Sequence, residues 1–481
     1  MIGNSRISGG QTVLVLAAFG ASLALGVAIA ALEFSVEGVL VLATAIVLAV
    51  PIVRRVEQGT FDLFEPMTAF CVTYGVLFVV RTGYMFINDD DFLLIGTEVA
   101  YLGDTFVPMQ LVALLGAIGF VVPYELGLGN AIGRRLPAPH NPGANTLALG
   151  GLITLVFGVL GTMMYISAIP GGFGALLAGR TQGLGIALTQ TSGYLVFLPT
   201  LLVPASLLLY LAWHMSRKTS YLVYSLAAAA LIIAVRGPTG GRVTLIPLIG
   251  GALVLWFLLR DRRPRLGAVV VTVVVGMFLW TLVGQVRNEE TRRSEGVQGI
   301  ATNLVNDPLT MIDPITEGQD AAMGPALAAG MSVIPSEIPY FNGTGILQDF
   351  AVRGIPRSLW PEKPVAPREQ FVSLLWSGGY NKGIANPEPS ILFSFYAEIG
   401  YPGVLIGMAV VAFLFRAALT YFRRFQANPV MLLIYAVFLA SIPTILRDSP
   451  TDSVVKVGFT IVPILAIAWF GRDRGHAGPV T

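Results

Sequence analysis

Residues 243–286 read VTLIPLIGGALVLWFLLRDRRPRLGAVVVTVVVGMFLWTLVGQV. Two apolar runs, 243–259 and 266–286, flank a short basic link at 260–265. Each run falls within the roughly 17–25 residues that an α-helix needs to cross a bilayer. Basic links of this kind are typical of cytoplasmic loops. The stretch therefore predicts two membrane-spanning helices joined on the cytoplasmic side.

The rest of the chain repeats this pattern. Of its 481 residues, 54% are apolar and 12% are charged, whereas soluble domains are about 25% charged. We expect an all-α polytopic membrane protein with about twelve spans, surrounded by membrane lipids. The expected spans lie near 11–32, 36–53, 66–84, 107–122, 145–168, 191–213, 220–236, 243–259, 266–286, 389–415, 430–446 and 454–470. The net charge of +2 gives no indication of a nucleic-acid partner.

The distribution of basic residues predicts the orientation of the chain. Alternate connections carry pairs or runs of arginine and lysine, and such connections face the cytoplasm. They include Arg54–Arg55, Arg134–Arg135, Arg217–Lys218, the 260–265 link and Arg423–Arg424. Both termini are therefore expected to be cytoplasmic. The first apolar run is expected to be a retained membrane helix and not a cleaved signal peptide, because further spans follow it directly.

The spans divide the chain into three parts. Residues 1–286 hold the first nine expected spans and an outer glycine-rich loop at 169–190, and residues 389–481 hold the last three and a cytoplasmic tail. Between them, 287–388 form an outer connection far longer than usual. This connection is too apolar for a disordered linker. We expect a small helical lid packed on the membrane surface.

Several kinds of site are missing from the sequence. The single cysteine, Cys71, excludes an intrachain disulfide and a cysteine metal site. The three histidines have no metal-ligand spacing, and no glycine-rich nucleotide loop occurs. We therefore expect neither a metal nor a cofactor. Any donor substrate would already be activated on a lipid.

Arginines on the expected outer side are the main candidates for ligand binding. Topology does not require cations there, and arginine forks suit phosphate. The candidates are Arg180, Arg236, Arg242, Arg353, Arg357 and Arg447. Arg236 and Arg242 flank a turn of glycines and Pro238, which lets backbone N–H groups approach an anion. The alternative for such arginines is a structural role in ion pairs or beside lipid headgroups.

Carboxylates and aromatic residues complete the candidate site. Glu398 lies inside the expected span 389–415, where an ionisable residue is a functional candidate. Glu398, Asp448 and Glu388 are candidate bases for an acceptor hydroxyl; a structural Glu398–arginine pair is the alternative. Trp360, Lys363 and Tyr380 are candidates for contact with sugars or phosphate.

Two local segments resemble a known family. They are IPRSLWPEKP at 355–364 and FYAEIGYPG at 395–403, with smaller matches at 171–173 and 239–242. Together with the layout of the spans, they are similar to the bacterial O-antigen polymerase (Wzy-type) or oligosaccharide repeat unit polymerase family. The resemblance implies a fold like that of the glycosyltransferase C class. It also implies location in the bacterial inner membrane with a periplasmic active face.

The resemblance further implies a reaction. A growing glycan on undecaprenyl pyrophosphate would be transferred to a lipid-linked repeat unit, and lipid pyrophosphate would be released. Whether a chain-length regulator protein binds stays open. The alternatives are an O-antigen ligase, another lipid-dependent glycosyltransferase and a lipid-linked oligosaccharide transporter. The outer connection 287–388 has no histidine, which disfavours the ligase, and the chain has no strong internal repeat, which disfavours the transporter.

Overall fold

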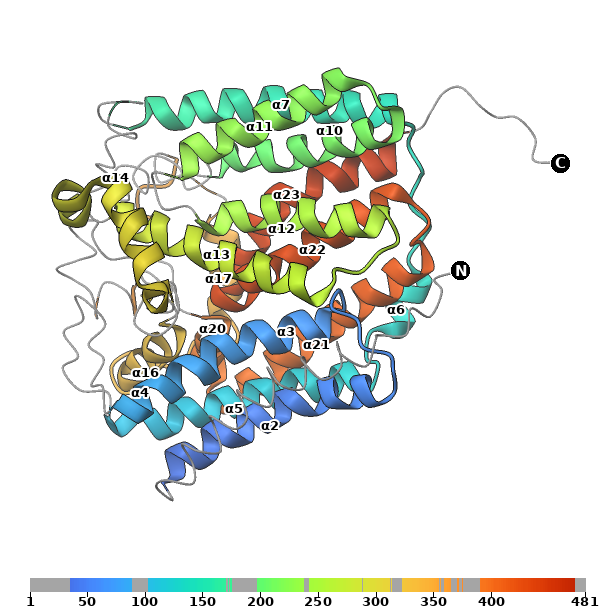
Figure 1. Ribbon diagram of the computed structural model, residues 1–481. Coiled ribbons are helices and arrows are strands. Elements are labelled where there is room, and N and C mark those ends of the chain that lie inside the picture. Colours follow the sequence, from blue (N-terminus) through green and yellow to red (C-terminus); the bar gives the residue numbers. More distant parts are fainter. Residues whose placement is uncertain are drawn as a thin grey trace. The chain divides into compact units, whose positions relative to one another are not determined.

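The structure, a computed structural model, is described here for the residues with well-determined placement. These are 35–88, 103–169, 197–237, 242–287, 289–311, 322–353, 359–364 and 390–471, with the isolated positions 172, 174, 313, 355, 370, 371 and 374. All regular structure in these residues is helical (Figure 1). The all-α class predicted from the sequence is confirmed.

Nine helical stretches of the described chain are long and apolar enough to cross a membrane. They are α2 (Val36–Glu57), α3 to α4 (Pro66–Phe86), α5 (Gly103–Glu125), α7 (Ala144–Ser167), η2 with α10 (Leu198–Ser216), α11 (Thr219–Arg236), α21 (Tyr401–Arg424), α22 (Pro429–Arg447) and α23 (Pro450–Phe470). The two runs quoted at the outset form the apolar helices α12 (Arg242–Leu259) and α13 (Leu266–Arg287). The expected span 11–32 lies outside the described residues, so a total of twelve stays a prediction.

The span expected at 389–415 is divided into two helices in the structure. The run 389–415 contains α20 (Ile391–Ile399), a break at Gly400 and the start of α21 at Tyr401. Gly400 has a φ of 71°, in the left-handed region that glycine adopts without strain. The membrane-crossing helix is therefore α21, and α20 is a separate short helix before it.

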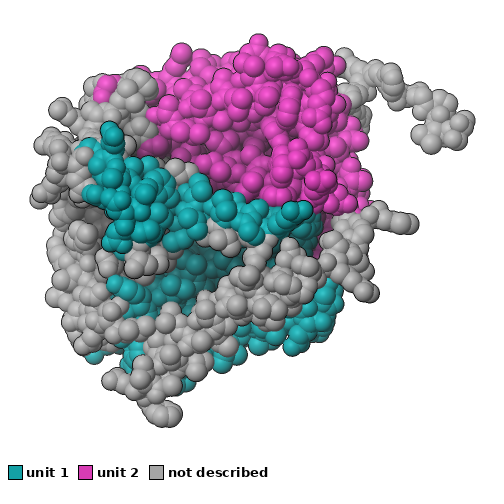
Figure 2. Space-filling view, in the orientation of Figure 1, with its two compact units in different colours: residues 1–131, 263–417, 442–452 teal, residues 132–262, 418–441, 453–481 magenta. Residues whose placement is uncertain are grey.

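The chain forms two compact units that alternate along the sequence (Figure 2). Unit 1 holds residues 1–131, 263–417 and 442–452, and unit 2 holds 132–262, 418–441 and 453–481. In unit 1, α2 packs against both α3 (Pro66–Gly75) and α5 (Figure 1). In unit 2, α10 packs against both α7 and α11.

An ion-pair network joins α2, α3 and α5 near the end that carries the basic pair Arg54–Arg55. The buried Arg55 guanidinium lies 2.8 Å from Glu65 and 2.6 Å from Glu125. It also donates a 3.0 Å hydrogen bond to the Pro51 carbonyl. Because a buried charge is costly unless paired, the network specifies how these three helices meet.

Hydroxyl groups join α10 and α11 inside unit 2. Ser206 Oγ donates to the Ser225 carbonyl at 3.0 Å, and Ser225 Oγ donates to the Ser206 carbonyl at 2.8 Å. Both serines are buried. Small hydroxyl side chains of this kind let membrane helices approach closely and bond to each other.

The outer connection contains a buried helix. It includes α14 (Glu289–Asn306), α16 (Met323–Val333) and α17 (Gly345–Arg353). Helix α16 is apolar and almost completely buried, and it packs against α5 and α20. With 11 residues, it is too short to cross a bilayer. The lid expected on the membrane surface therefore does not include α16, because its apolar residues are buried among other helices of unit 1.

We predict that Gly330 is needed for α16 to pack. A side chain at Gly330 would overlap the ring of Phe393 on α20. Gly330→Leu should destabilise the protein by about 1–3 kcal/mol through overpacking, measured as a lower melting temperature in detergent. The control is Gly276→Leu on α13, where no atom lies within 4 Å of an added Cβ. Equal melting temperatures for the two variants would contradict the predicted packing.

Candidate functional site

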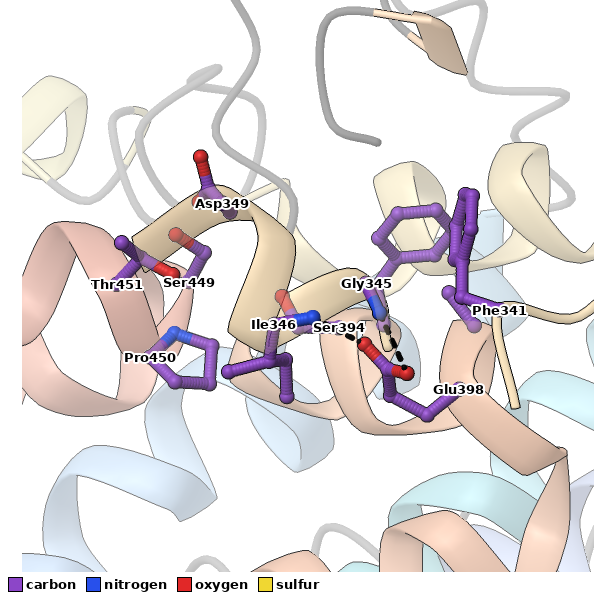
Figure 3. Close-up of a pocket in the computed structure, with 11 residues that line it drawn as sticks. Phe341, Gly345, Ile346, Asp349, Ser394, Glu398, Ser449, Pro450 and Thr451 are labelled. Carbon is purple, nitrogen blue, oxygen red and sulfur yellow. Dashed lines mark hydrogen bonds between the residues drawn. The ribbon is translucent and has the colours of Figure 1, made fainter. Parts of the chain in front are cut away.

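A pocket lies in unit 1 where three segments far apart in the sequence meet (Figure 3). These are the start of α17, the helix α20 and the connection between α22 and α23. The lining residues are Phe341, Gly345, Ile346, Asp349, Phe393, Ser394, Ala397, Glu398, Ser449, Pro450 and Thr451. The cavity is about 40 Å³, enough for a few water molecules or one protruding chemical group.

Glu398 holds the beginning of α17. The Gly345 N–H donates to Glu398 Oε2 at 3.1 Å, and the Ile346 N–H donates to Oε1 at 2.6 Å (Figure 3). The first N–H groups of a helix have no partner within the helix, and they carry its positive dipole end. The carboxylate of Glu398, on the neighbouring helix α20, accepts hydrogen bonds from two of these N–H groups and places a negative charge at the positive end of the helix.

The backbone before α17 is fixed to the same place. The N–H groups of Phe341 and Asn342 donate to the carbonyls of Ala397 and Glu398 at 3.0 and 2.8 Å. Asn342 and Gly343 then turn the chain with φ of 53° and 83°, as Asn-Gly pairs favour. At Gly345 a Cβ would lie 2.6 Å from Glu398 Oε1. Glycine is therefore the residue that lets the carboxylate reach the helix end.

These contacts give Glu398 a positioning role. Sequence reasoning predicted it as a catalytic base or as the partner of an arginine. Each of its oxygens instead accepts a backbone N–H of α17. The catalytic role stays a prediction, and the geometry favours another carboxylate for it.

That carboxylate is Asp349, which the sequence analysis did not select. It lies one turn after Gly345 on α17, lines the pocket and is 7% exposed. Its neighbours Leu347, Phe350 and Val352 are apolar. A lone acid in such a helix is the sequence signal that could have identified it.

The connection between α22 and α23 is buried and capped. Ser449 Oγ accepts the Asp452 N–H at 3.2 Å and donates to Asp452 Oδ2 at 3.0 Å. With Pro450 at the first helical position, Ser449 is thus the N-cap residue of α23. Asp448, a predicted base, is completely buried directly before Ser449. It therefore lies beside the pocket, although it is not among the lining residues.

The other predicted site residues are distributed over the molecule. Arg447 ends α22 next to Asp448, and Arg353 ends α17, although the Arg353 side chain is not described. In unit 2, Arg236 is buried at the end of α11, with its guanidinium carbon 4.9 Å from the centre of the Tyr165 ring. Arg242 begins α12, and its side chain is not described.

Beyond α17, Trp360 is partly exposed, and Lys363 Nζ donates to the Ile355 carbonyl at 3.0 Å. Arg180, Arg357, Tyr380 and Glu388 lie outside the described residues. The structure thus brings Glu398, Arg447 and Asp448, with the helix that ends at Arg353, to the elements around one pocket. Arg236 and Arg242 belong to unit 2.

A further buried cation lies within a span. Arg81 follows a π-helical turn, η1 (Val76–Val80), and its side chain has no exposed surface. Its complete burial excludes contact of the guanidinium with lipid headgroups. Single π-helical turns often occur at functional sites, and charges inside membranes are costly. Arg81 is therefore a further candidate residue.

We predict that Glu398→Ala loosens α17 selectively. The variant leaves two backbone N–H groups at the helix start without their acceptor, which should cost about 1.5–3 kcal/mol. Hydrogen–deuterium exchange should speed up in 345–352 and stay unchanged in α16. The exposed Glu362→Ala serves as the control. Unchanged exchange in 345–352 would remove the positioning role from Glu398.

The chain was compared with protein families, curated proteins and solved structures. No family model, no curated protein and no solved structure matches the chain. The resemblance noted in the sequence rests on short segments, and the helical architecture alone is compatible with many activities. The pocket, its carboxylates and the arginines on the same elements are therefore the basis for a functional assignment.

Proposed function

We propose that the protein is a lipid-pyrophosphate-dependent glycosyltransferase, a polysaccharide polymerase of the bacterial inner membrane. It transfers a growing glycan from undecaprenyl pyrophosphate to a repeat unit carried on the same kind of lipid. The transfer takes place at the periplasmic face and uses neither a nucleotide sugar nor a metal. The observation that carries the proposal is a buried carboxylate, Asp349, in a small pocket that also presents Ser394 and Ser449.

Asp349 acts as the general base. It accepts the proton of the acceptor hydroxyl while that oxygen attacks the anomeric carbon of the donor sugar. A new carbon–oxygen bond forms, and the bond to pyrophosphate breaks with its electron pair going to the phosphate oxygen. The cavity of about 40 Å³ has room for an acceptor hydroxyl beside the carboxylate. Exclusion of water matters, since a hydrolysed donor is lost.

Arginines stabilise the departing pyrophosphate. Negative charge develops on the leaving oxygen, and fixed cations near it lower the barrier. Arg353 and Arg447 are carried by the elements that build the pocket, α17 and the end of α22. The sequence adds Arg180, Arg236, Arg242 and Arg357 on the expected outer side. Guanidinium groups bind phosphate through paired hydrogen bonds, so a metal ion is not required.

We predict that Asp349→Asn prevents polymerisation. Removal of a general base should slow transfer by about 100- to 10,000-fold, while the protein still inserts into the membrane. Purified protein in nanodiscs is incubated with native lipid-pyrophosphate-linked repeat units, without nucleotide sugar or metal. Products are separated on a gel as a ladder. The exposed Glu337→Gln is the matched control.

The same assay separates the alternatives. A ladder with one-repeat spacing from wild type and Glu337→Gln, but not from Asp349→Asn, supports both the polymerase and its base. A normal ladder from Asp349→Asn would show that Asp349 is not the general base. Transfer by wild type only after addition of a lipid A core would make the protein a ligase. No transfer of native substrate under either condition would favour transport.

Two arginine variants test the leaving-group part of the proposal. Arg242→Ala and Arg357→Ala should each abolish the ladder, because each removes a cation that the donor pyrophosphate needs. Both variants should reach the membrane at wild-type levels. Arg135→Ala, in a connection predicted to be cytoplasmic, is the control and should polymerise normally. Normal chain lengths in both outer variants would exclude the arginine cluster as the pyrophosphate site.

A further inference from the structure

Helix α17 exposes two large apolar side chains. Its outward side carries Leu347 and Phe350, which are 68% and 39% exposed. Its inward side carries Asp349 and Val352, which are 7% and 5% exposed, and Asp349 lines the pocket. A helix in water normally buries its leucine and phenylalanine and exposes its acid. The outward side of α17 therefore suits an apolar environment.

The helix lies at the level where a membrane span begins. Helix α21 runs from Tyr401 to the basic pair Arg423–Arg424, the end expected at the cytoplasmic surface. About 20 residues cross the hydrocarbon core of a bilayer, so the 24 residues of α21 reach its opposite boundary near Tyr401. The chain just before α17 is hydrogen-bonded to Ala397 and Glu398, a few residues from that point.

An aromatic cluster occupies the same level. The ring of Tyr396 packs edge to face against Tyr340 and Tyr401, with centroids 5.9 and 5.6 Å apart. The hydroxyls of Tyr340 and Tyr396 lie 3.4 Å apart. Tyrosines concentrate at membrane–water boundaries, where the ring lies in an apolar layer and the hydroxyl in a polar one. The cluster joins the segment leading into α17 to the beginning of α21.

The apolar surface continues after the helix. Leu359 is 78% exposed and Trp360 is 38% exposed. Tryptophan is the other residue that membrane boundaries favour. Leu347 and Phe350 are referred to below as the α17 apolar face.

We propose that the α17 apolar face is inserted into the boundary between headgroups and acyl chains of the outer leaflet. Its partner is the phospholipid bilayer itself. The helix then lies along the membrane surface, with its apolar side in lipid and its Asp349 side toward the pocket. This placement rests on exposure, helix length and the tyrosine cluster, and it does not depend on the transfer reaction.

Spin labels test the placement in the intact protein. The only native cysteine, Cys71, is 1% exposed, so labels attach to introduced cysteines, with labelled wild type as the background. The test variants are Leu347→Cys and Phe350→Cys. Phe157 on span α7 is 60% exposed, and Phe157→Cys is the lipid reference. Glu337 is also exposed, and Glu337→Cys is the water reference. Each is reconstituted in nanodiscs of phosphatidylethanolamine and phosphatidylglycerol.

The measurement is the ratio of collision rates with oxygen, which concentrates in lipid, and with a water-soluble nickel chelate. We expect the oxygen-to-nickel ratios at positions 347 and 350 to be several-fold higher than the ratio at 337. They should approach the ratio at the lipid-facing position 157. Nickel collision at the level of position 337 would place the face in water and overturn the proposal. Exclusion of both reagents would also overturn it, because protein would then cover the face.

Discussion

A peptide group inside a bilayer must find a hydrogen-bond partner within the protein, because lipid offers none. Long spans meet this requirement along their length, but every helix end leaves unpaired N–H or C=O groups. The helices that begin around the pocket therefore need acceptors for their first N–H groups. Glu398 serves the start of α17, Ser390 serves α20 through its hydroxyl, and Ser449 serves α23.

This requirement also explains how polar residues gather at one place. The residues that cap α17 and α23, Glu398 and Ser449, are the same residues that line the pocket. Capping fixes the position of each of these two side chains. Asp349 belongs to the helix that Glu398 holds, and its position follows from that contact.

The spans could be predicted well because each depends on a local property, the length of an apolar run. Gly400 was the exception, since one glycine in the left-handed conformation divides an apolar run that otherwise reads as continuous. Contacts between distant residues could not be predicted in this way. The pairing of Arg55 with Glu65 and Glu125, and of Glu398 with the start of α17, depends on how helices pack. Sequence reasoning therefore selected Glu398 and Asp448, which the structure places in and beside the pocket, but not Asp349, whose burial depends on the position of α17.

The alternation of the two units along the chain has a consequence for biosynthesis. Residues 442–452 belong to unit 1, although that unit begins with the first part of the chain to leave the ribosome. The pocket needs Ser449, Pro450 and Thr451, so it is incomplete until almost the entire chain has entered the membrane. A nascent chain that stopped before α22 would contain α17 and α20. It would lack Ser449, Pro450 and Thr451, which line the rest of the pocket. The pocket is thus completed only when synthesis of the chain is nearly finished.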